Sequence, residues 1–189
     1  MSAQTRPMQI LDVTESLLVD AGGAGLTMRK IAASSGISLG NLQYHFATRE
    51  DLMLALLMRF LAPYEDRLKQ LPKSLPEDVA DALSGIFMDV LNDPNFDRCA
   101  TIYKEIWAAS SHSNEMRNAL NAYYTRLAQF YQALLSRLAA PETAPQKIER
   151  AAAAIMPALE GYCITKDTVD VPVDIIAEDW ATMVAALLR

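Results

Sequence analysis

The stretch of residues 27–49 constrains the fold most, because its residue order predicts two short helices joined by a tight turn. Thr27 precedes an apolar-periodic run, where its hydroxyl can accept a hydrogen bond from a backbone N–H of the first helical turn. Gly36 provides a residue that adopts positive φ without a Cβ clash, and Ser38 can cap the helix that follows. The stretch therefore predicts a helix–turn–helix.

The apolar spacing of this stretch separates an inner face from an outer one. Ala32 is small enough to let a second helix cross close by, while Leu42 and Phe46, at a spacing of four, are expected to face inward. The outer face of the second helix then holds small, amide and aromatic groups at Leu39, Gly40, Asn41, Gln43, Tyr44 and His45. Such an exposed row on a short helix is typical of a helix–turn–helix that enters a DNA major groove.

Residues 10–57 resemble the DNA-binding domain of the TetR family of bacterial transcription regulators. The resemblance lies in three strings, ILDVTESLLVDAG (10–22), TMRKIAASSGIS (27–38) and GNLQYHFATREDL (40–52), which correspond to the first four helices of that family. The remainder resembles the family in its length and helical character. The resemblance implies a transcriptional regulator that binds a double-stranded DNA operator in a sequence-specific way.

The resemblance also implies which side chains contact DNA. Thr27 and Arg29 open the supporting helix and would contact phosphate. Tyr44, His45 and Arg49 would also bind phosphate, Arg49 from the start of the fourth helix. The full set of implied DNA contacts is Thr27, Arg29, Ser38, Leu39, Gly40, Asn41, Gln43, Tyr44, His45 and Arg49.

Five members of this set, beginning with Ser38, belong to the recognition helix of the resembled family. Asn41 and Gln43 carry the donor–acceptor pairs that read adenine, and Leu39 could touch a thymine methyl group. Gly40 would allow the helix backbone to approach the DNA closely. Position 43 is often aromatic in the family and is glutamine here. The resemblance therefore predicts the docking of this helix more firmly than the identity of each base contact.

Charge and hydropathy limit the class of protein. The first 49 residues hold four basic and three acidic residues, whereas the rest hold 13 and 20, so the two parts carry net charges of +1 and −7. An acidic body argues against sequence-blind nucleic-acid binding. No apolar run reaches the roughly 18–20 residues of a membrane span, and the N-terminus lacks the apolar core of a signal peptide. We therefore expect a cytoplasmic protein that does not engage a membrane.

The remaining sequence predicts an all-α fold with about nine helices and no strand. Pro63 is expected to kink or end the fourth helix, which opens with a Thr48–Asp51 capping box, and LPKSLPED (71–78) is expected to break the chain. Motif content divides the chain into a helix–turn–helix DNA-binding domain, residues 1–50, and a helical effector-binding and dimerisation domain, residues 51–189. Beyond the break, helices are expected over 77–92, 96–109, 114–139, 146–165 and 173–188.

The last two predicted helices carry more apolar surface than one chain can hide. Residues 151–156 read AAAAIM, and the final helix is apolar on more than one face. A helix of this kind usually covers its apolar surface with a second copy of the chain. We therefore expect a homodimer with a four-helix interface that includes Ala152, Ile155, Ile176, Trp180, Met183, Val184 and Leu187.

Aromatic and methionine side chains of the central helices form a second group. Ordinary core packing explains each of them by itself, but the C-terminal helices of the TetR family usually hold an effector, so the resemblance predicts an apolar ligand pocket. Glu160 interrupts the apolar face and could meet a polar ligand group, or it is a solvated or paired carboxylate. The pocket is expected to include Phe87, Met88, Tyr103, Trp107, Tyr123, Phe130, Tyr131, Met156 and Glu160.

The motifs of common all-α and hydrolytic enzymes do not occur. There is no E-x-x-H pair and no G-x-S-x-G, and Cys99 and Cys163 have no metal or redox spacing. We expect no catalytic residue, no cofactor and no metal. The resemblance implies a repressor that binds a palindromic operator as a dimer, with recognition helices about 34–36 Å apart, and that a small apolar or amphipathic effector releases. A helical interaction protein with a silent DNA-binding head is the alternative.

Overall fold

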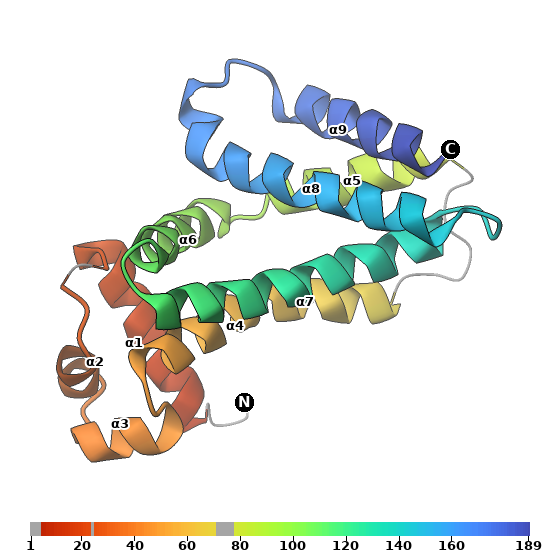
Figure 1. The fold of residues 1–189 in the computed structure, drawn as a ribbon. Helices are drawn as coiled ribbons and strands as arrows, with labels where there is room; N and C mark the ends of the chain where they lie inside the picture. The colour runs from red at the N-terminus through yellow and green to blue at the C-terminus, as the bar shows by residue number, and fades with distance from the viewer. Residues whose placement is uncertain (1–4, 24, 71–77) are drawn as a thin grey trace. The chain divides into compact units, whose positions relative to one another are not determined.

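The computed structural model of the protein describes residues 5–23, 25–70 and 78–189. These residues form nine α-helices and one short 3-10 helix, with no strand among them, which confirms the all-α prediction (Figure 1). The helices are α1 (Arg6–Ala21), α2 (Met28–Ser34), α3 (Leu39–His45), α4 (Arg49–Gln70), α5 (Val79–Leu91), α6 (Phe96–Ser110), α7 (Asn114–Leu138), α8 (Pro145–Thr165), η1 (Lys166–Thr168) and α9 (Val173–Leu188).

The predicted caps set the bounds of the short helices. The Thr27 hydroxyl accepts a hydrogen bond from the Lys30 N–H at 3.2 Å, and the Ser38 hydroxyl accepts one from the Asn41 N–H at 3.2 Å. Gly36 lies between α2 and α3 with a φ of +66°, a conformation that L side chains rarely adopt. The sequence therefore predicted the starts of α2 and α3 and the turn between them correctly.

Helix α4 begins at its predicted cap and runs past Pro63. Thr48 and Asp51 form the predicted reciprocal cap, because each backbone N–H donates to the side chain of the other, at 3.1 and 3.0 Å. Pro63 lies inside α4 and does not end it, so the helix runs on to Gln70. Most of the predicted break at residues 71–78 lies outside the described residues, although Asp78 is described and caps α5 by accepting from the Ala80 N–H.

The chain packs as two compact units. The first unit consists of Met1–Ala62 and Arg98–Tyr124, and the second of Pro63–Asp97 and Thr125–Arg189. The boundary within α4 thus falls at Pro63, whereas the division at residue 50 that motif content predicts describes where the helix–turn–helix residues end. The core of the first unit gathers α1–α4 and α6 around buried side chains such as Ile10, Ile31, Leu42, Leu56 and Ile102.

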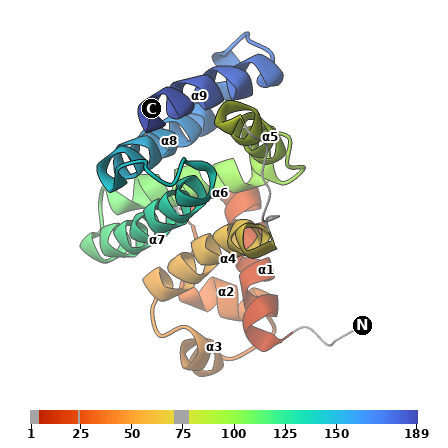
Figure 2. The same cartoon turned by 90° about the vertical axis from the view of Figure 1, so that its right-hand side faces the viewer.

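The second unit includes α5, α8 and α9, which pack side by side in both views (Figures 1 and 2). Leu83, Phe87 and Leu91 recur at every fourth position of α5 and are all buried. Ala177 and Ala181 of α9 are fully buried, and their small side chains allow neighbouring helices to approach closely. Among the described residues, no helix combines the length and apolarity that crossing a membrane requires.

Candidate DNA-binding interface

Helices α2 and α3 hide their apolar face and leave a polar one outside. Ile31 and Leu42 are fully buried, Ala32 is 3% exposed and Phe46 is 9% exposed, as the spacing predicts. Gly40, Asn41, Gln43 and Tyr44 are exposed on α3, Leu39 and His45 are half-buried, and the capping residues Thr27 and Ser38 are exposed. The predicted inner and outer faces of α3 are therefore the observed ones.

Tyr44 is the most exposed large hydrophobic side chain of the described residues, at 84%. Its ring meets the His45 ring edge to face, with centroids 5.2 Å apart. A phenol held in water gains nothing from burial in the folded chain. Tyr44 therefore takes no part in the core of the first unit and is open to contact from solvent.

Gly40 lies within α3, yet neither packing nor backbone conformation requires a glycine there. A Cβ atom built at Gly40 meets nothing within 4 Å, and its φ is not positive. Glycine inside a helix costs about 1 kcal/mol relative to alanine. A glycine that the isolated fold does not need is a feature of sites where a ligand approaches the backbone closely.

The basic groups near α2 include one that the sequence analysis missed. Arg29 and Lys30 are consecutive and both exposed in the first turn of α2, which holds no acidic residue. Lys30 was not among the predicted contacts, although its charge and its position after Arg29 were a usable signal. Two exposed cations beside the α3 face give this side of the first unit a local positive charge that suits phosphate.

Arg49 has a contact that the sequence did not indicate. Its Nη2 donates to the carbonyl oxygen of Gly23 at 3.0 Å, and its Nε is buried without a hydrogen-bond partner among the described residues. Gly23 belongs to the turn between α1 and α2, and its N–H donates to Oε2 of Glu105 at 2.7 Å. The predicted phosphate contact of Arg49 stays a prediction, beside this observed role in the turn.

A buried ionic network joins three helices of the first unit. Glu15 of α1 is only 6% exposed and accepts hydrogen bonds from Arg59 of α4 and Arg98 of α6. Arg59 also donates to Asp12 at 2.6 Å. A buried carboxylate is stable only when it is paired and hydrogen-bonded, and the two arginines meet that requirement. Apolar periodicity in the sequence does not predict that these residues form ion pairs.

The residues predicted to line a ligand pocket are divided between the two units. In the first unit, the Tyr103 ring lies 6.4 Å from the ring of Tyr123 and 6.4 Å from that of Tyr124, which the prediction omitted. Trp107, also of α6, is 52% exposed. The Tyr103 hydroxyl is buried without a hydrogen-bond partner among the described residues. These aromatic side chains form a cluster, hereafter the tyrosine cluster, of Tyr103, Tyr123 and Tyr124.

The other predicted pocket residues lie in the second unit and do not form one group. Phe130 borders a small hollow of about 90 Å³ that Tyr64, Ile86 and Asp89 also line. Phe87 is buried against Trp180, with ring centroids 6.0 Å apart, and Tyr131 is buried. Met88, Met156 and Glu160 are half-buried and do not line this hollow.

The predicted dimer residues differ in what covers them. Ala152, Ile155, Ile176 and Val184 are at most 7% exposed within a single chain, because α5, α8 and α9 pack on one another. Met183 is 66% exposed, and Trp180 and Leu187 are half-buried.

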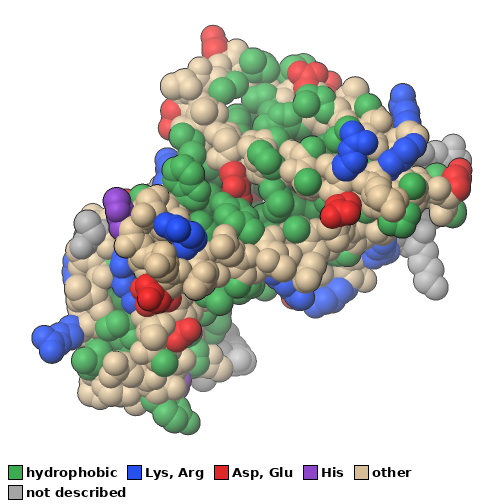
Figure 3. Space-filling model, viewed as in Figure 1, with side chains coloured by type: hydrophobic (Ala, Val, Ile, Leu, Met, Phe, Trp, Pro, Cys, Tyr) green, Lys and Arg blue, Asp and Glu red, His purple; other side chains and the backbone are tan. Residues whose placement is uncertain are grey.

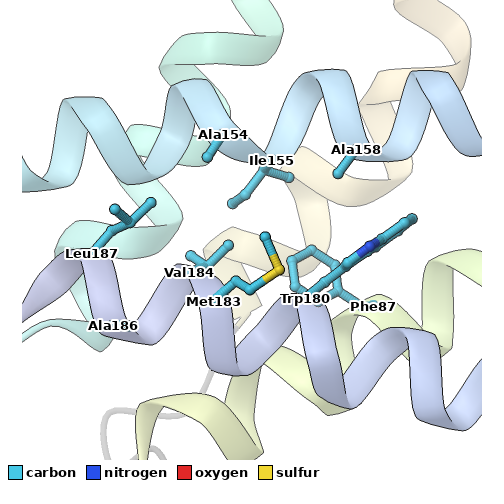
Figure 4. Close-up of a pocket in the computed structure, with 9 residues that line it drawn as sticks. All are labelled: Phe87, Ala154, Ile155, Ala158, Trp180, Met183, Val184, Ala186 and Leu187. Carbon is cyan, nitrogen blue, oxygen red and sulfur yellow. The ribbon is translucent and has the colours of Figure 1, made fainter.

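These three residues border an apolar hollow of about 320 Å³ (Figure 4). Hydrophobic side chains also gather over α8 and α9 in Figure 3. The hollow is lined by Phe87, Ala154, Ile155, Ala158, Trp180, Met183, Val184, Ala186 and Leu187.

Comparison with known proteins gives related families for both parts of the chain. Residues 10–56 match the bacterial regulatory proteins, tetR family, and residues 79–189 match the BetI-type transcriptional repressor, C-terminal. The whole chain is 28% identical to an HTH-type transcriptional regulator in the dhlA 5′ region of Xanthobacter autotrophicus and covers 93% of it. It is 24% identical over 123 residues to the HTH-type transcriptional regulator BetI of Stenotrophomonas maltophilia, which is 65% of this chain and 63% of that protein.

Solved structures share the fold along the whole chain. The multidrug binding protein EbrR complexed with ethidium superposes with a TM-score of 0.70 at 24% identity and covers 98% of this chain and 99% of its own. Salmonella enterica GusR superposes with a TM-score of 0.72 at 17% identity and covers 100% and 97%. The family matches span the helix–turn–helix and more than half of the chain, so this protein belongs to the TetR family: it is a transcriptional regulator with an N-terminal DNA-binding domain, and not an enzyme.

Proposed function

We propose that the protein is a ligand-responsive repressor that binds a palindromic operator as a homodimer. The observation that carries the proposal is the outer face of α3, where a Tyr44 ring that is 84% exposed stands beside a helical glycine with open space above it. Asn41 and Gln43 are exposed on the same helix and have the donor–acceptor pairs that can read adenine. In this proposal Thr27, Arg29, Lys30 and His45 hold the phosphate backbone while α3 reads base edges.

Dimerisation is supported by the apolar surface of α8 and α9. Met183 and Ile175 are 66% and 43% exposed on α9, and the hollow beside Met183 is lined by apolar residues alone. Two copies that join these helices would cover that surface and place two α3 helices on successive major grooves, about 34–36 Å apart. A regulator that reads chromosomal DNA acts where that DNA lies, so the proposal includes a cytoplasmic location.

Selection of duplexes from a random pool, followed by fluorescence anisotropy across a salt series, tests DNA binding. We expect the dimer to select a palindrome and to bind it with nanomolar affinity that falls as salt rises. The matched control carries Asn41→Ala and Tyr44→Ala, which remove two exposed side chains and leave the core intact. We expect this control to fold and dimerise but to lose about 100-fold in affinity, since the lost Asn41 base contact costs about 1–3 kcal/mol and the lost Tyr44 phosphate contact adds to it.

A pool that yields no selected duplex would contradict the DNA-binding proposal and favour the helical interaction protein. A reporter gene placed behind the selected operator then tests the sign of regulation. Lower expression with the protein present is the result that repression requires, and higher expression would contradict it.

The effector is proposed to be a small, amphipathic aromatic molecule. The tyrosine cluster brings three rings within 5.8–6.4 Å of one another, and the buried Tyr103 hydroxyl has an unused hydrogen-bonding capacity. Aromatic faces attract organic cations as well as flat apolar rings. EbrR, which shares the fold, has been solved with ethidium and with malachite green. These observations support an aromatic ligand for this chain.

Ethidium serves as the probe for this class of effector, because its fluorescence rises when it leaves water. We expect saturable enhancement with the wild-type protein in the absence of DNA, and at least about tenfold weaker binding in Tyr103→Ala, on the scale of a lost aromatic contact and hydrogen bond. Tyr44→Ala is the matched control and should bind ethidium as the wild type does. Equal binding by Tyr103→Ala and the wild type would contradict the placement of the ligand at the tyrosine cluster.

A further inference from the structure

The turn between α1 and α2 is held at Gly23 from two sides. The Gly23 N–H donates to Oε2 of Glu105 at 2.7 Å, and Nη2 of Arg49 donates to the Gly23 carbonyl oxygen at 3.0 Å. Glu105 lies in α6 and Arg49 is the first residue of α4. Gly23 is buried. Charged side chains from two different helices thus form hydrogen bonds with the N–H and the carbonyl oxygen of a single buried residue.

These contacts are stronger than a turn of this kind requires. A buried backbone N–H or carbonyl needs a hydrogen-bond partner, but water or another backbone group satisfies it, and the Leu26 N–H already donates to the Gly23 carbonyl oxygen at 3.2 Å. A hydrogen bond with one ionised partner is roughly twice as strong as a neutral one. A Cβ atom at Gly23 would lie 2.9 Å from Oε2 of Glu105, so the carboxylate reaches the backbone because residue 23 has no side chain.

The position of this turn is passed directly to the DNA-binding helices. Leu26 follows Gly23 by three residues and is 3% exposed, and Thr27, the next residue, caps α2. Helices α2 and α3 then pack on each other through buried Ile31, Ala32 and Leu42. A displacement of Gly23 would therefore displace α2 and α3 as a pair.

Helix α6 is attached to α1 at a second point as well. Arg98 and Glu105 are seven residues apart, which places them on one face of α6, and Arg98 donates to the buried Glu15 of α1. Ile102 and Ile106 of α6 are 0% and 2% exposed. Polar contacts at both ends of this face, with apolar packing between them, hold α6 against α1 and the turn that follows it.

We propose that Glu105 is a positioning residue for DNA binding. Glu105, Arg49 and the backbone of Gly23 form a latch, hereafter the turn latch, that sets α2 and α3 in the orientation that meets DNA. This inference rests on the proposed function, because it takes α3 as the helix that reads DNA. In the turn latch Arg49 acts from within the protein, through the Gly23 carbonyl, and not as a phosphate ligand.

The direction in which DNA affinity changes when Glu105 is substituted distinguishes this positioning role from a purely electrostatic effect. DNA is a polyanion, so removing a negative charge from the DNA-binding unit strengthens binding when the charge acts only through its field. The turn latch requires the opposite result, because loss of the carboxylate releases the Gly23 N–H. The matched control is Asp20→Ala, which removes an exposed acid of α1 in the same unit.

Anisotropy against the selected operator compares Glu105→Ala with Asp20→Ala. We expect Glu105→Ala to weaken binding about tenfold, the scale of one hydrogen bond to a charged group, and Asp20→Ala to leave it unchanged or stronger. Alanine favours the helix that Glu105 occupies, so folded protein is expected, and thermal unfolding checks it. Glu105→Ala that binds as tightly as the wild type, or more tightly, overturns the proposal.

A second pair of variants changes no charge. Gly23→Ala places a Cβ 2.9 Å from Oε2 of Glu105, whereas Gly25→Ala places one no closer than 3.8 Å to Nζ of Lys30. We expect Gly23→Ala to weaken DNA binding and Gly25→Ala to leave it unchanged. Equal affinities of the two folded variants overturn the proposal. Hydrogen exchange at the Gly23 amide adds a readout without DNA, and it should be faster in Glu105→Ala than in the wild type.

The salt dependence of Arg49→Ala distinguishes the latch from a phosphate contact. Loss of a phosphate ligand makes the negative slope of log K against log salt shallower by about 0.9 for each contact. Loss of the latch lowers affinity at every salt concentration with the slope unchanged, and its effect does not add to that of Glu105→Ala. A shallower salt slope together with additive effects overturns the role of Arg49 in the latch.

Failure of this inference and failure of the proposed function give different results. A wild-type protein that selects no duplex would overturn DNA binding, and the positioning role of Glu105 with it. A wild-type protein that binds its operator, with Glu105→Ala behaving like Asp20→Ala, would overturn the turn latch alone.

Discussion

The face of α3 and the face of α8 and α9 leave different chemistry to solvent. In α3, the apolar Leu42 is fully buried and the exposed side chains are amides and one phenol. In α8 and α9, the apolar Met183 and Ile164 stay 66% and 53% exposed, and a hollow of about 320 Å³ beside Met183 has only apolar walls. Because apolar surface in water is unfavourable, covering the second face would release free energy, which supports the proposed homodimer interface there.

This difference indicates what each surface meets. The α3 face is stable in water, so it can exist free and exchange water for a hydrated polyanion. The α8–α9 face gains free energy when it is covered, at roughly 25 cal/mol for each Å² of apolar surface removed from water. In the proposed function, the homodimer interface at α8–α9 is therefore expected to be long-lived and the DNA contact at α3 reversible.

Trp180→Glu, which tests the α8–α9 surface, is expected to have the largest effect of the variants, on the strength of the dimer. The substitution places a carboxylate at the apolar hollow, and an unpaired buried charge costs about 3–5 kcal/mol, so the dimer should weaken by at least about 100-fold. The matched control is Val19→Glu, which puts the same charge on an apolar residue of the first unit that is 39% exposed. Sedimentation velocity measures both, and an unchanged dimer in Trp180→Glu would contradict the interface.

Gly40→Ala separates the stability of α3 from its DNA binding, because the two are expected to change in opposite directions. Open space above Gly40 lets a methyl group enter, so α3 should gain about 0.5–1 kcal/mol. The same methyl group should weaken operator binding if the helix backbone approaches DNA closely. Gly85→Ala in α5 also meets nothing within 4 Å and serves as the control. The unfolding temperature should rise for both variants, while the operator affinity measured by anisotropy should fall only for Gly40→Ala. Equal operator affinities of the two variants would exclude a close backbone approach.

Lys166→Met is expected to have the smallest effect, confined to the second unit. Nζ of Lys166 lies 2.8 Å from Asp167 and 2.9 Å from Asp97, and these hydrogen bonds raise the pKa of Lys166 above its ordinary value. A raised pKa means that the stabilisation is fully present below the ordinary lysine pKa, about 10.4, and is lost only above it.

Thermal unfolding of Lys166→Met and the wild type at pH 6, 7.5 and 9 should therefore differ by the same small amount at each pH. Operator affinity should not change. A difference that grows or shrinks within this pH range would show that another titrating group controls the contact.

Local sequence predicted much of the fold because the interactions that end helices span only a few residues. Thr27, Ser38 and Thr48 cap helices through groups three residues away, and Gly36 takes the positive φ that its turn requires. Pro63 was expected to kink or end α4, and of these two outcomes the helix does not end there but continues to Gln70. A local rule of this kind therefore did not set the length of α4.

The candidate sites depended more on partners far away in the sequence. Tyr44, Asn41 and Gln43 were predictable because an exposed position on a short amphipathic helix follows from periodicity alone. Ile176 and Val184 were predicted to face a second chain, but α5 and α8 already bury them within one chain. Periodicity identifies an apolar face, and it does not say which helix covers it.

The helix–turn–helix, its caps, the inner and outer faces of α3 and the resemblance to the TetR family follow from residue order alone. The meeting of Arg49 and Glu105 at Gly23 depends on the packed fold, since these partners lie 26 and 82 residues from it along the chain. The packed fold also sets which apolar residues of α8 and α9 stay on the surface. The physical reason is range: helix caps and periodicity arise within one or two turns, whereas burial and charge pairing depend on which distant segments pack together.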